Sequence, residues 1–229
     1  MSKRRDAAAG VGAPAPAARV LPMRPLPAVL LSALLVVVAV AAGVTVDRFL
    51  HPAPTGAFAS CRPQTATAPG RYAGPPPKCI DPAANYQATL VTTKGSVTMQ
   101  LLPKESPQTV NNFVVLAVNH YYDGLRFWRV DSWVALAGDP DNNGRGGPGY
   151  TLPSEPRAAG SKWAPGDFGM ARYPDSRVSG SQFFVLRTAW QGGDPSAPYN
   201  HFATVTLGFD VLGQVGTSDR ILQVSVRKA

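Results

Sequence analysis

The sequence predicts one mostly-β domain with two helices, spanning about residues 83–229, preceded by a single transmembrane helix and a proline-rich stalk. Three observations support this. Alternation of apolar and polar residues begins at Tyr86, and short runs of it recur towards the C-terminus. Earlier in the chain, residues 28–46 form a run of nineteen positions without a charge. Eight prolines lie in residues 47–82, between this run and the alternating region. A chain of 229 residues is long enough for one ordinary domain with such additions.

The charge-free run of residues 28–46 is predicted to cross a membrane as a helix. At about 1.5 Å per residue it spans roughly 28 Å, close to the thickness of a hydrocarbon core. Bases precede it within residues 1–27, so this basic tail is expected in the cytoplasm and the rest of the chain outside. A signal peptide is the alternative, since Ala39-Val40-Ala41 has the small residues of a cleavage site. The domain is therefore expected to be exported, either anchored in the cell membrane by one span or secreted after cleavage.

Residues 47–82 are predicted to form a linker. Their eight prolines and weak apolar periodicity favour extended chain and a semi-rigid stalk. Cys61 and Cys79 lie in this segment, 18 positions apart. Because cysteines outside the cytoplasm usually pair, a Cys61–Cys79 disulfide is expected, and two free thiols are the alternative.

The domain is predicted to open with a hairpin. Apolar positions alternate through Tyr86–Thr92, a Lys94-Gly95 turn follows, and alternation resumes over Val97–Leu101. A helix is predicted next, because Ser106-Pro107 supplies a cap and a proline at the first helical position. Its core-facing side is expected to hold the apolar residues that recur at helical spacing, namely Val110, Phe113, Val114 and Ala117.

The second half of the domain is predicted to consist mainly of strands. Tyr122-Asp123-Gly124 forms a turn into a β-rich stretch, Leu125–Leu136. Four more strands are predicted at Asp167–Ala171, Gln182–Arg187, His201–Thr206 and Ile221–Arg227. The sequence has no internal repeat, so a single domain accounts for the whole region.

The net charge of +8 is concentrated before the domain. Residues 80–229 hold thirteen bases and twelve acids, so the domain is nearly neutral and a nucleic-acid partner is not expected. The three histidines and two cysteines are too scattered for a zinc site. The glycines at 144, 146 and 149 match a dinucleotide fingerprint, but the prolines after them are incompatible with the helix that this motif needs. No metal and no cofactor are therefore expected.

Five motifs stand in a fixed order along the domain: Ser106–Phe113 (SPQTVNNF), Tyr122–Val130 (YDGLRFWRV), Gly138–Pro140 (GDP), Gly146–Tyr150 (GGPGY) and Gly180–Val185 (GSQFFV). Together they resemble the cyclophilin family of peptidyl-prolyl cis-trans isomerases over about residues 84–226. The resemblance implies a closed eight-stranded antiparallel barrel with a helix over each end. It also implies an isomerase that acts, as a monomer, on X-Pro bonds of proline-containing exported polypeptides.

The family's catalytic arginine matches Arg129. The resemblance places a substrate groove around it, made by Trp133, Val134, Leu136, Ala171, Arg172, Gln182, Phe184 and Tyr199. Rotation about an X-Pro bond must break amide resonance, and it needs neither a nucleophile nor a proton transfer. The apolar side chains Phe184, Val134 and Ala171 suit a pocket for the proline ring. The guanidinium of Arg129 suits donation to the imide nitrogen as that nitrogen pyramidalises.

The segment around Arg129 departs from the family pattern and is one residue shorter. The family's histidine is Trp128 here, and its Pro-Gly is Asp131-Ser132. Its groove glutamine is replaced by Leu136, or by Ala135 or Ala137 if the gap lies elsewhere. In the family that glutamine helps to orient the arginine, so its loss is expected to weaken catalysis. The alternative hypothesis is a cyclophilin fold without turnover that serves as a proline-peptide binding or scaffolding module.

Overall fold

The computed structural model describes residues 53–158, 160–194 and 198–229, all within one compact unit, Asp47–Ala229. The predicted cytoplasmic tail (1–27) and the predicted anchor (28–46) lie outside the described residues. Among the residues that the structure describes, no helix has the length and apolar character needed to cross a membrane.

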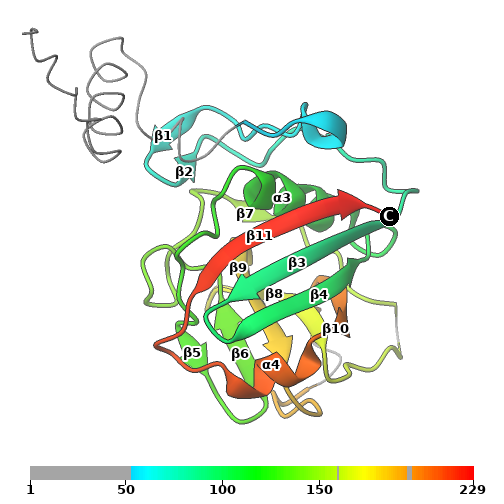
Figure 1. The fold of residues 1–229 in the computed structure, drawn as a ribbon, viewed down its shortest axis with the longest axis vertical. Helices are drawn as coiled ribbons and strands as arrows, with labels where there is room; N and C mark the ends of the chain where they lie inside the picture. Colours follow the sequence, from blue (N-terminus) through cyan, green and yellow to red (C-terminus); the bar gives the residue numbers. More distant parts are fainter. Residues whose placement is uncertain (1–52, 159, 195–197) are drawn as a thin grey trace, which may run out of the picture. The chain divides into compact units, whose positions relative to one another are not determined.

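One large antiparallel sheet forms the body of the domain (Figure 1). Its strands are β3 (Tyr86–Thr92), β4 (Gly95–Leu101), β5 (Arg129–Val130), β6 (Val134–Ala137), β7 (Thr151–Leu152), β8 (Asp167–Arg172), β9 (Val178–Leu186), β10 (His201–Leu207) and β11 (Ile221–Lys228). They follow the order β11-β3-β4-β10-β8-β9-β6-β5, and β7 pairs with β9 beside this path.

The predicted strands are present. In the hairpin of β3 and β4, Thr92 lies opposite Gly95, and buried residues alternate with partly exposed ones. The four later strands also form, with β9 beginning at Val178, four residues before its predicted start. Every residue of β9 is buried, so this strand carries no alternation that could have marked its beginning.

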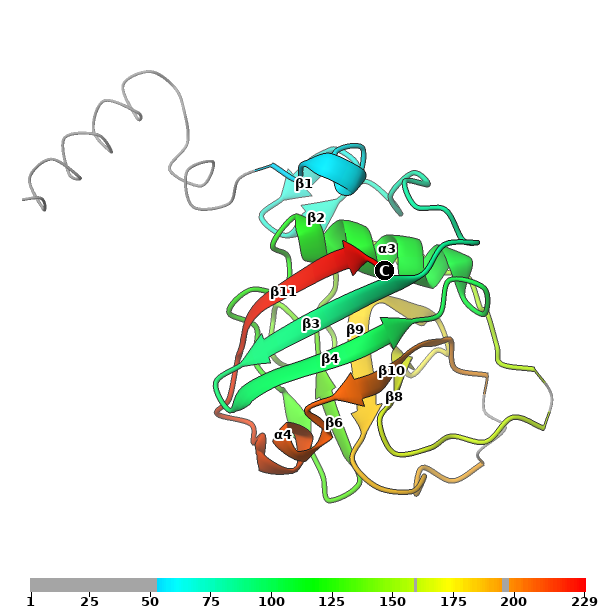
Figure 2. The ribbon, with the colours of Figure 1, turned by 45° about the vertical axis from the view of Figure 1, so that its right-hand side comes forward.

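The sheet curls into a half-barrel, so the expectation of a closed eight-stranded barrel is wrong (Figure 2). The end strands β11 and β5 are not joined by a ladder. The chain before β5 approaches the start of β11 through an isolated bridge between Arg126 and Arg220, flanked by hydrogen bonds of the Gly124 and Phe127 amides. β5 is only two residues long because the chain turns directly after it, where the Asp131 amide donates to the Val134 carbonyl. So short a strand cannot extend the pairing to β11.

Two helices pack on the sheet, α3 (Pro107–Val118) and the shorter α4 (Phe209–Gln214). α3 has Ser106 at its N-cap and lies along β11 (Figures 1 and 2). It buries the four apolar residues predicted to face the core: Val110, Phe113, Val114 and Ala117. The Phe113 ring lies 5.1 Å from the Phe202 ring and 5.3 Å from the Tyr122 ring, measured between centroids. This aromatic group joins α3 to the sheet in the main core.

The described part of the predicted linker, residues 53–82, packs on the domain. It contains the short helix η1 (Gly56–Phe58) and a pair of short strands, β1 (Ala66–Ala68) and β2 (Arg71–Tyr72). Three of its side chains are buried in the main core: Phe58, Cys61 and Ile80. The predicted Cys61–Cys79 disulfide is present.

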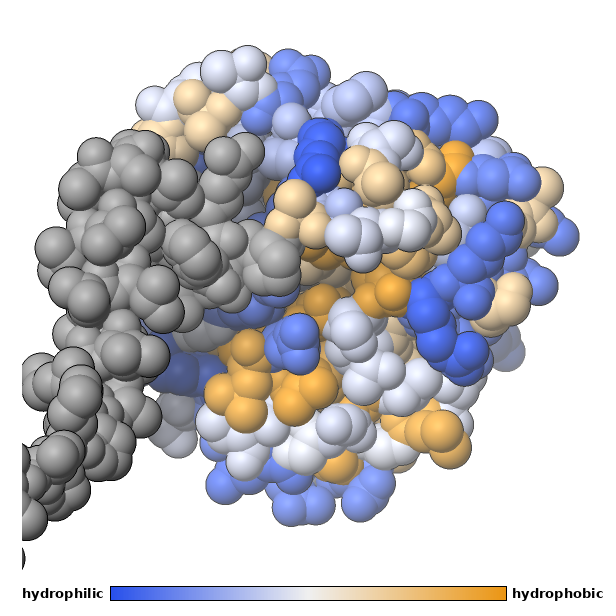
Figure 3. Space-filling view, turned by 45° about the horizontal axis from the view of Figure 1, so that its top comes forward, coloured by the Kyte–Doolittle hydropathy of each residue, from blue (hydrophilic) through white to orange (hydrophobic). Residues whose placement is uncertain are grey.

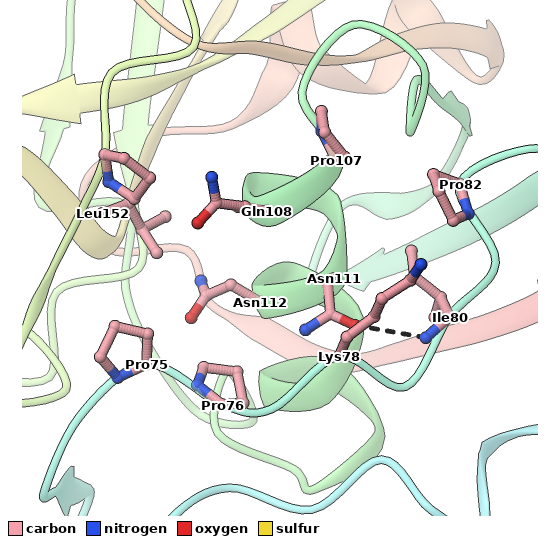
Figure 4. Close-up of a pocket in the computed structure, with 11 residues that line it drawn as sticks. Pro75, Pro76, Lys78, Ile80, Pro82, Pro107, Gln108, Asn111, Asn112 and Leu152 are labelled. Carbon is pink, nitrogen blue, oxygen red and sulfur yellow. Dashed lines mark hydrogen bonds between the residues drawn. The ribbon is translucent and has the colours of Figure 1, made fainter.

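Asn111 of α3 holds this segment against the helix. Its Oδ1 accepts hydrogen bonds from the amides of Cys79 (2.8 Å) and Ile80 (3.3 Å, the dashed line in Figure 4), and its Nδ2 donates to the Pro77 carbonyl at 3.1 Å. A cavity of about 260 Å³ lies beside this contact, lined by prolines of the segment and by the start of α3. Extended chain leaves its backbone groups unpaired, and the Asn111 side chain satisfies three of them.

The surface of the molecule is mixed in character. On the face shown in Figure 3, apolar side chains form small groups between hydrophilic ones. In the described part of the chain, three large apolar side chains are clearly exposed: Leu207, Phe209 and Leu222. A few exposed apolar side chains are ordinary on protein surfaces.

Candidate active site

A row of cross-strand neighbours brings the predicted site residues together. Arg129 of β5 lies opposite Leu136 of β6, and Leu136 lies opposite Phe184 of β9. Phe184 in turn lies opposite Gly169 of β8. Because directly opposite residues in a sheet project to the same face, the arginine, the leucine and the phenylalanine share one surface.

These side chains line a cavity of about 200 Å³. Its wall contains all nine residues that the resemblance placed at the site: Arg129, Trp133, Val134, Leu136, Ala171, Arg172, Gln182, Phe184 and Tyr199. Three further residues complete the lining: Trp128, Gly144 and Trp190. A hollow that combines an apolar wall with several polar side chains is typical of a ligand site.

The apolar wall is a second hydrophobic cluster, separate from the main core. Its buried members are Val134, Trp163, Phe184 and Leu186. The Phe184 ring lies 5.2 Å from the Trp163 ring and 5.2 Å from the Tyr199 ring, measured between centroids. Aromatic neighbours on two sides therefore fix the position of Phe184.

Gly169 leaves the space that the Phe184 ring occupies. A Cβ atom at position 169 would lie 2.3 Å from Cζ of Phe184 and 2.8 Å from Cη2 of Trp163. Both distances are shorter than non-bonded carbon atoms tolerate. The apolar wall therefore depends on a strand position that has no side chain.

The Arg129 side chain is 53% exposed and is held by Asp131, two residues along the chain. Oδ2 of Asp131 accepts from Nε of Arg129 at 2.8 Å and lies 2.6 Å from Nη2. These contacts occupy one edge of the guanidinium, which carries five N–H donors. The remaining N–H donors of the Arg129 guanidinium are thus unused by the residues that the structure describes, and Arg129 lines the same cavity as the apolar wall.

Gln182 and Arg172 are tied to the loops around the cavity. Nε2 of Gln182, a buried residue, donates to the Gly146 carbonyl at 2.7 Å. The Arg172 guanidinium donates to three groups, namely the Ser176 carbonyl, Ser154 Oγ and the Pro198 carbonyl. Both side chains therefore brace the rim of the cavity.

A network of ionisable side chains packs against Trp163 of the aromatic wall. The Trp163 ring packs against the ring of His201 (5.3 Å between centroids) and under the guanidinium of Arg157 (5.0 Å). Both of these side chains contact the carboxylate of Asp167, at 3.3 Å and 3.1 Å. Burial by itself raises the pKa of Asp167, but hydrogen bonds to His201, Ala164 and Thr204 outweigh it and hold the pKa below its ordinary value of 3.8.

Comparison with known proteins gives the family. A family model described as "Cyclophilin type peptidyl-prolyl cis-trans isomerase/CLD" matches residues 88–228. This chain belongs to the cyclophilin family. The domain is 40% identical over 104 residues to a peptidyl-prolyl cis-trans isomerase of Helicobacter pylori (strain ATCC 700392 / 26695), a match that spans 45% of this chain and 63% of that relative. It is 32% identical over 142 residues to peptidyl-prolyl cis-trans isomerase B of Bacillus subtilis (strain 168), spanning 60% of this chain and 94% of that relative.

Solved structures show the same cyclophilin fold. A cyclophilin type peptidyl-prolyl cis-trans isomerase of Cryptosporidium parvum superposes with a TM-score of 0.56 at 20% sequence identity, over 63% of this chain and 99% of that one. A second structure of that protein, determined in the presence of the dipeptide Ala-Pro, gives a TM-score of 0.55 at 21% identity, over 62% and 99% of the two chains.

The resemblance left three residues of this cyclophilin domain as replacements for the family's groove glutamine, and the structure shows which of them faces the cavity. Leu136 lines the cavity and lies opposite Arg129. Ala135 and Ala137, the two other candidates, are buried in the main core. Of the three, Leu136 is therefore the side chain that faces the groove, and it offers no hydrogen-bonding group to the arginine.

Part of the aromatic lining of the cyclophilin groove was not predicted from the sequence. Trp163 had no predicted role, and Trp128 and Trp190 lay outside the predicted site. These residues come from different loops and reach the cavity through tertiary contacts, so no local pattern marks them. The one available signal was composition: all four tryptophans of the chain, these three and Trp133, line the cavity or contact Phe184.

Proposed function

We propose that the protein is a peptidyl-prolyl cis-trans isomerase that acts on X-Pro bonds of exported polypeptides. One observation carries the proposal: in a member of the cyclophilin family, Arg129 lines the same hollow as the apolar side chains Phe184, Val134 and Ala171. The named relatives from Helicobacter pylori and Bacillus subtilis support it, as does the structural relative determined with Ala-Pro.

The proposed chemistry needs no cofactor. The X-Pro bond faces a rotation barrier of about 18–20 kcal/mol, because twisting removes amide resonance. In the proposed mechanism the proline ring occupies the hollow against Phe184. As the bond twists, the imide nitrogen pyramidalises and its lone pair becomes an acceptor for a free N–H of Arg129. This hydrogen bond exists only in the twisted state, so it lowers the barrier without tightening ground-state binding.

The test of the mechanism is Arg129→Ala. We expect kcat/KM on a proline peptide to fall at least tenfold, equivalent to about 1.4 kcal/mol of barrier, while ground-state affinity changes much less. Arg129→Lys should recover little, because a single ammonium does not reproduce the planar fork of donors. A protease-coupled assay on a proline tetrapeptide measures the rate, and equal rates for wild type and Arg129→Ala would exclude the mechanism.

A second candidate function is a proline-peptide binding module without turnover. The observation that favours it is that Leu136, where the resemblance places the glutamine that helps to orient the arginine, is an apolar side chain in the cavity wall opposite Arg129. Wild-type protein with no measurable isomerisation, but with a peptide affinity that falls in Phe184→Ala, would establish this second function.

We further propose that the domain works outside the cytoplasm, either tethered by residues 28–46 or secreted after signal-peptide cleavage at Ala39-Val40-Ala41. The Cys61–Cys79 disulfide supports export, because the cytoplasm keeps most thiols reduced. Alkylation of thiols in undisturbed cells should leave both cysteines unlabelled. Labelling of both, or activity of a cytoplasm-only reporter fused after Ala229, would contradict export.

A further inference from the structure

We propose that Asp131 is a positioning residue for Arg129 and supplies the orientation that the side chain at position 136 cannot. This inference rests on the proposed isomerase function. Oδ2 of Asp131 contacts both Nε and Nη2 of Arg129, at 2.8 Å and 2.6 Å. Two contacts to one oxygen fix the plane of the guanidinium as well as its position. Both Nη1 hydrogens and the second Nη2 hydrogen remain for a substrate.

Asp131 can act as a fixed point because its own backbone is held on both sides. Its amide donates to the Val134 carbonyl at 2.8 Å, which closes the turn between β5 and β6. Its carbonyl accepts from Nη1 of Arg187 at 2.8 Å. Nη2 of the same arginine donates to the Gly213 carbonyl of α4 at 2.7 Å. The turn that carries Asp131 is thus anchored to a helix outside the groove.

The sheet offers Arg129 no comparable partner. Its cross-strand neighbour is Leu136, and the next residue in the row is Phe184, so both adjacent side chains are apolar. In the described part of the chain, Asp131 is the one side chain that accepts a hydrogen bond from Arg129. Without Asp131, a half-exposed arginine would sample many rotamers, and only some of them would point its donors at the twisted bond.

The effect of removing Asp131 should fall on catalysis and not on folding. Both side chains of the pair reach solvent, since 53% of the Arg129 side chain and 35% of the Asp131 side chain are exposed. Ion pairs at the surface contribute little to stability. The chain also provides a matched control. Asp175 and Arg177 form the same kind of pair two residues apart, with Oδ2 of Asp175 accepting from Nε of Arg177 at 2.7 Å, and neither residue lines the cavity of Arg129.

The experiment compares Asp131→Ala with Asp175→Ala in the full chain. Exchange NMR on a proline peptide gives the turnover rate, and titration calorimetry gives the affinity. We expect Asp131→Ala to lower kcat at least fivefold with affinity within twofold of wild type, and Asp175→Ala to change neither. An unchanged kcat would overturn the proposal. A raised kcat would also overturn it, because Asp131 would then compete with the substrate for the guanidinium.

A rescue variant separates positioning from a general structural effect. Leu136→Gln introduces a polar side chain directly opposite Arg129. We expect it to raise kcat more in the Asp131→Ala background than in wild type, because the two side chains would serve the same guanidinium. Equal effects in the two backgrounds would show that Asp131 does not act through Arg129.

A readout that needs no turnover keeps this inference distinct from the proposed function. Nitrogen-15 relaxation of the Arg129 Nε–H group reports how firmly the guanidinium is held. Its order parameter should fall in Asp131→Ala and stay at the wild-type value in Asp175→Ala. If wild-type protein has no isomerase activity, a fall still supports positioning while the proposed function fails. An unchanged order parameter overturns the positioning role whatever the activity.

Discussion

At the scale of single residues, the site depends on the lack of a side chain at Gly169. Gly169 lies opposite Phe184, and the Phe184 ring fills the space where a side chain at 169 would project. Trp163 closes the same space from its other side, 2.8 Å from a Cβ placed at position 169. The ring therefore has no direction in which to yield without opening the apolar wall.

Gly169→Ala should consequently act as a groove mutation. One added methyl would push the Phe184 ring towards the cavity, because its neighbours Trp163 and Leu186 are buried and close-packed. We expect peptide affinity to fall at least fivefold, in the direction of the loss caused by Phe184→Ala. Calorimetric titration with a proline peptide measures this. Gly213→Ala is a suitable control, because a Cβ at that exposed helical glycine meets no atom within 4 Å. Wild-type affinity in Gly169→Ala would show that the ring position does not matter.

At the scale of elements, the N-terminus of α3 is capped by a side chain from a loop that is distant in the sequence. The side chain of its N-cap, Ser106, makes no capping hydrogen bond and donates instead to the His201 carbonyl at 2.8 Å. The carboxylate of Glu155 caps the helix in its place, accepting from the amides of Gln108 and Thr109 at 2.9 Å each. A negative group at this end also complements the helix dipole.

Glu155→Ala should therefore destabilise the domain. Losing a cap usually lowers the free energy of unfolding by about 1–2 kcal/mol, and the amides of the first helical turn would then have to hydrogen-bond to water. Urea unfolding measures the change, and Glu105→Ala provides a control at another glutamate, whose carboxylate contacts one side chain of the described residues, His201. Peptide affinity should stay within twofold of wild type, since Glu155 does not line the groove. Unchanged stability would mean that the Ser106 hydroxyl or water caps the helix instead.

Local patterns predicted the elements that are amphipathic and failed where contacts are long-range. The alternation in Tyr86–Thr92 and the helical stripe beginning at Val110 are one-sided patterns, and both elements were predicted correctly. The prolines of residues 53–82 predict extended chain, and nothing local reveals that Asn111 would hold that chain against α3. Likewise the family resemblance placed Arg129 and Phe184 in one groove, but Asp131 gained its contact with the arginine at a position where the family pattern is broken.

At the scale of the whole molecule, one buried carboxylate links several parts of the domain. Asp167 begins β8, contacts Arg157 in the preceding loop, and contacts His201 at the start of β10. Through these partners it supports Trp163 and, beyond it, the groove. The stability of the fold and the shape of the site should therefore respond to the ionisation of this group.

The sign of the pH dependence follows from the lowered pKa of Asp167. The unfolded chain binds the proton near pH 3.8, and the folded protein binds it only at lower pH. The stabilisation is complete above pH 3.8 and is lost as the pH falls through the folded pKa. In Asp167→Asn we expect a loss of about 3 kcal/mol at neutral pH and a flatter acid limb. Urea unfolding at a series of pH values measures both, and parallel acid limbs in the two proteins would contradict the assignment.

All four tryptophans lie at the groove, so the intrinsic tryptophan fluorescence of the protein comes from this one site. Trp128, Trp133 and Trp190 line the cavity, and Trp163 packs against Phe184 at its wall. Indole emission depends on the polarity around the ring, and here no tryptophan lies elsewhere to contribute a constant background. Intrinsic fluorescence should therefore report on the contents of the groove with no attached dye. The same emission would follow unfolding of the aromatic wall, so ligand titration and local opening can be observed in one unlabelled sample.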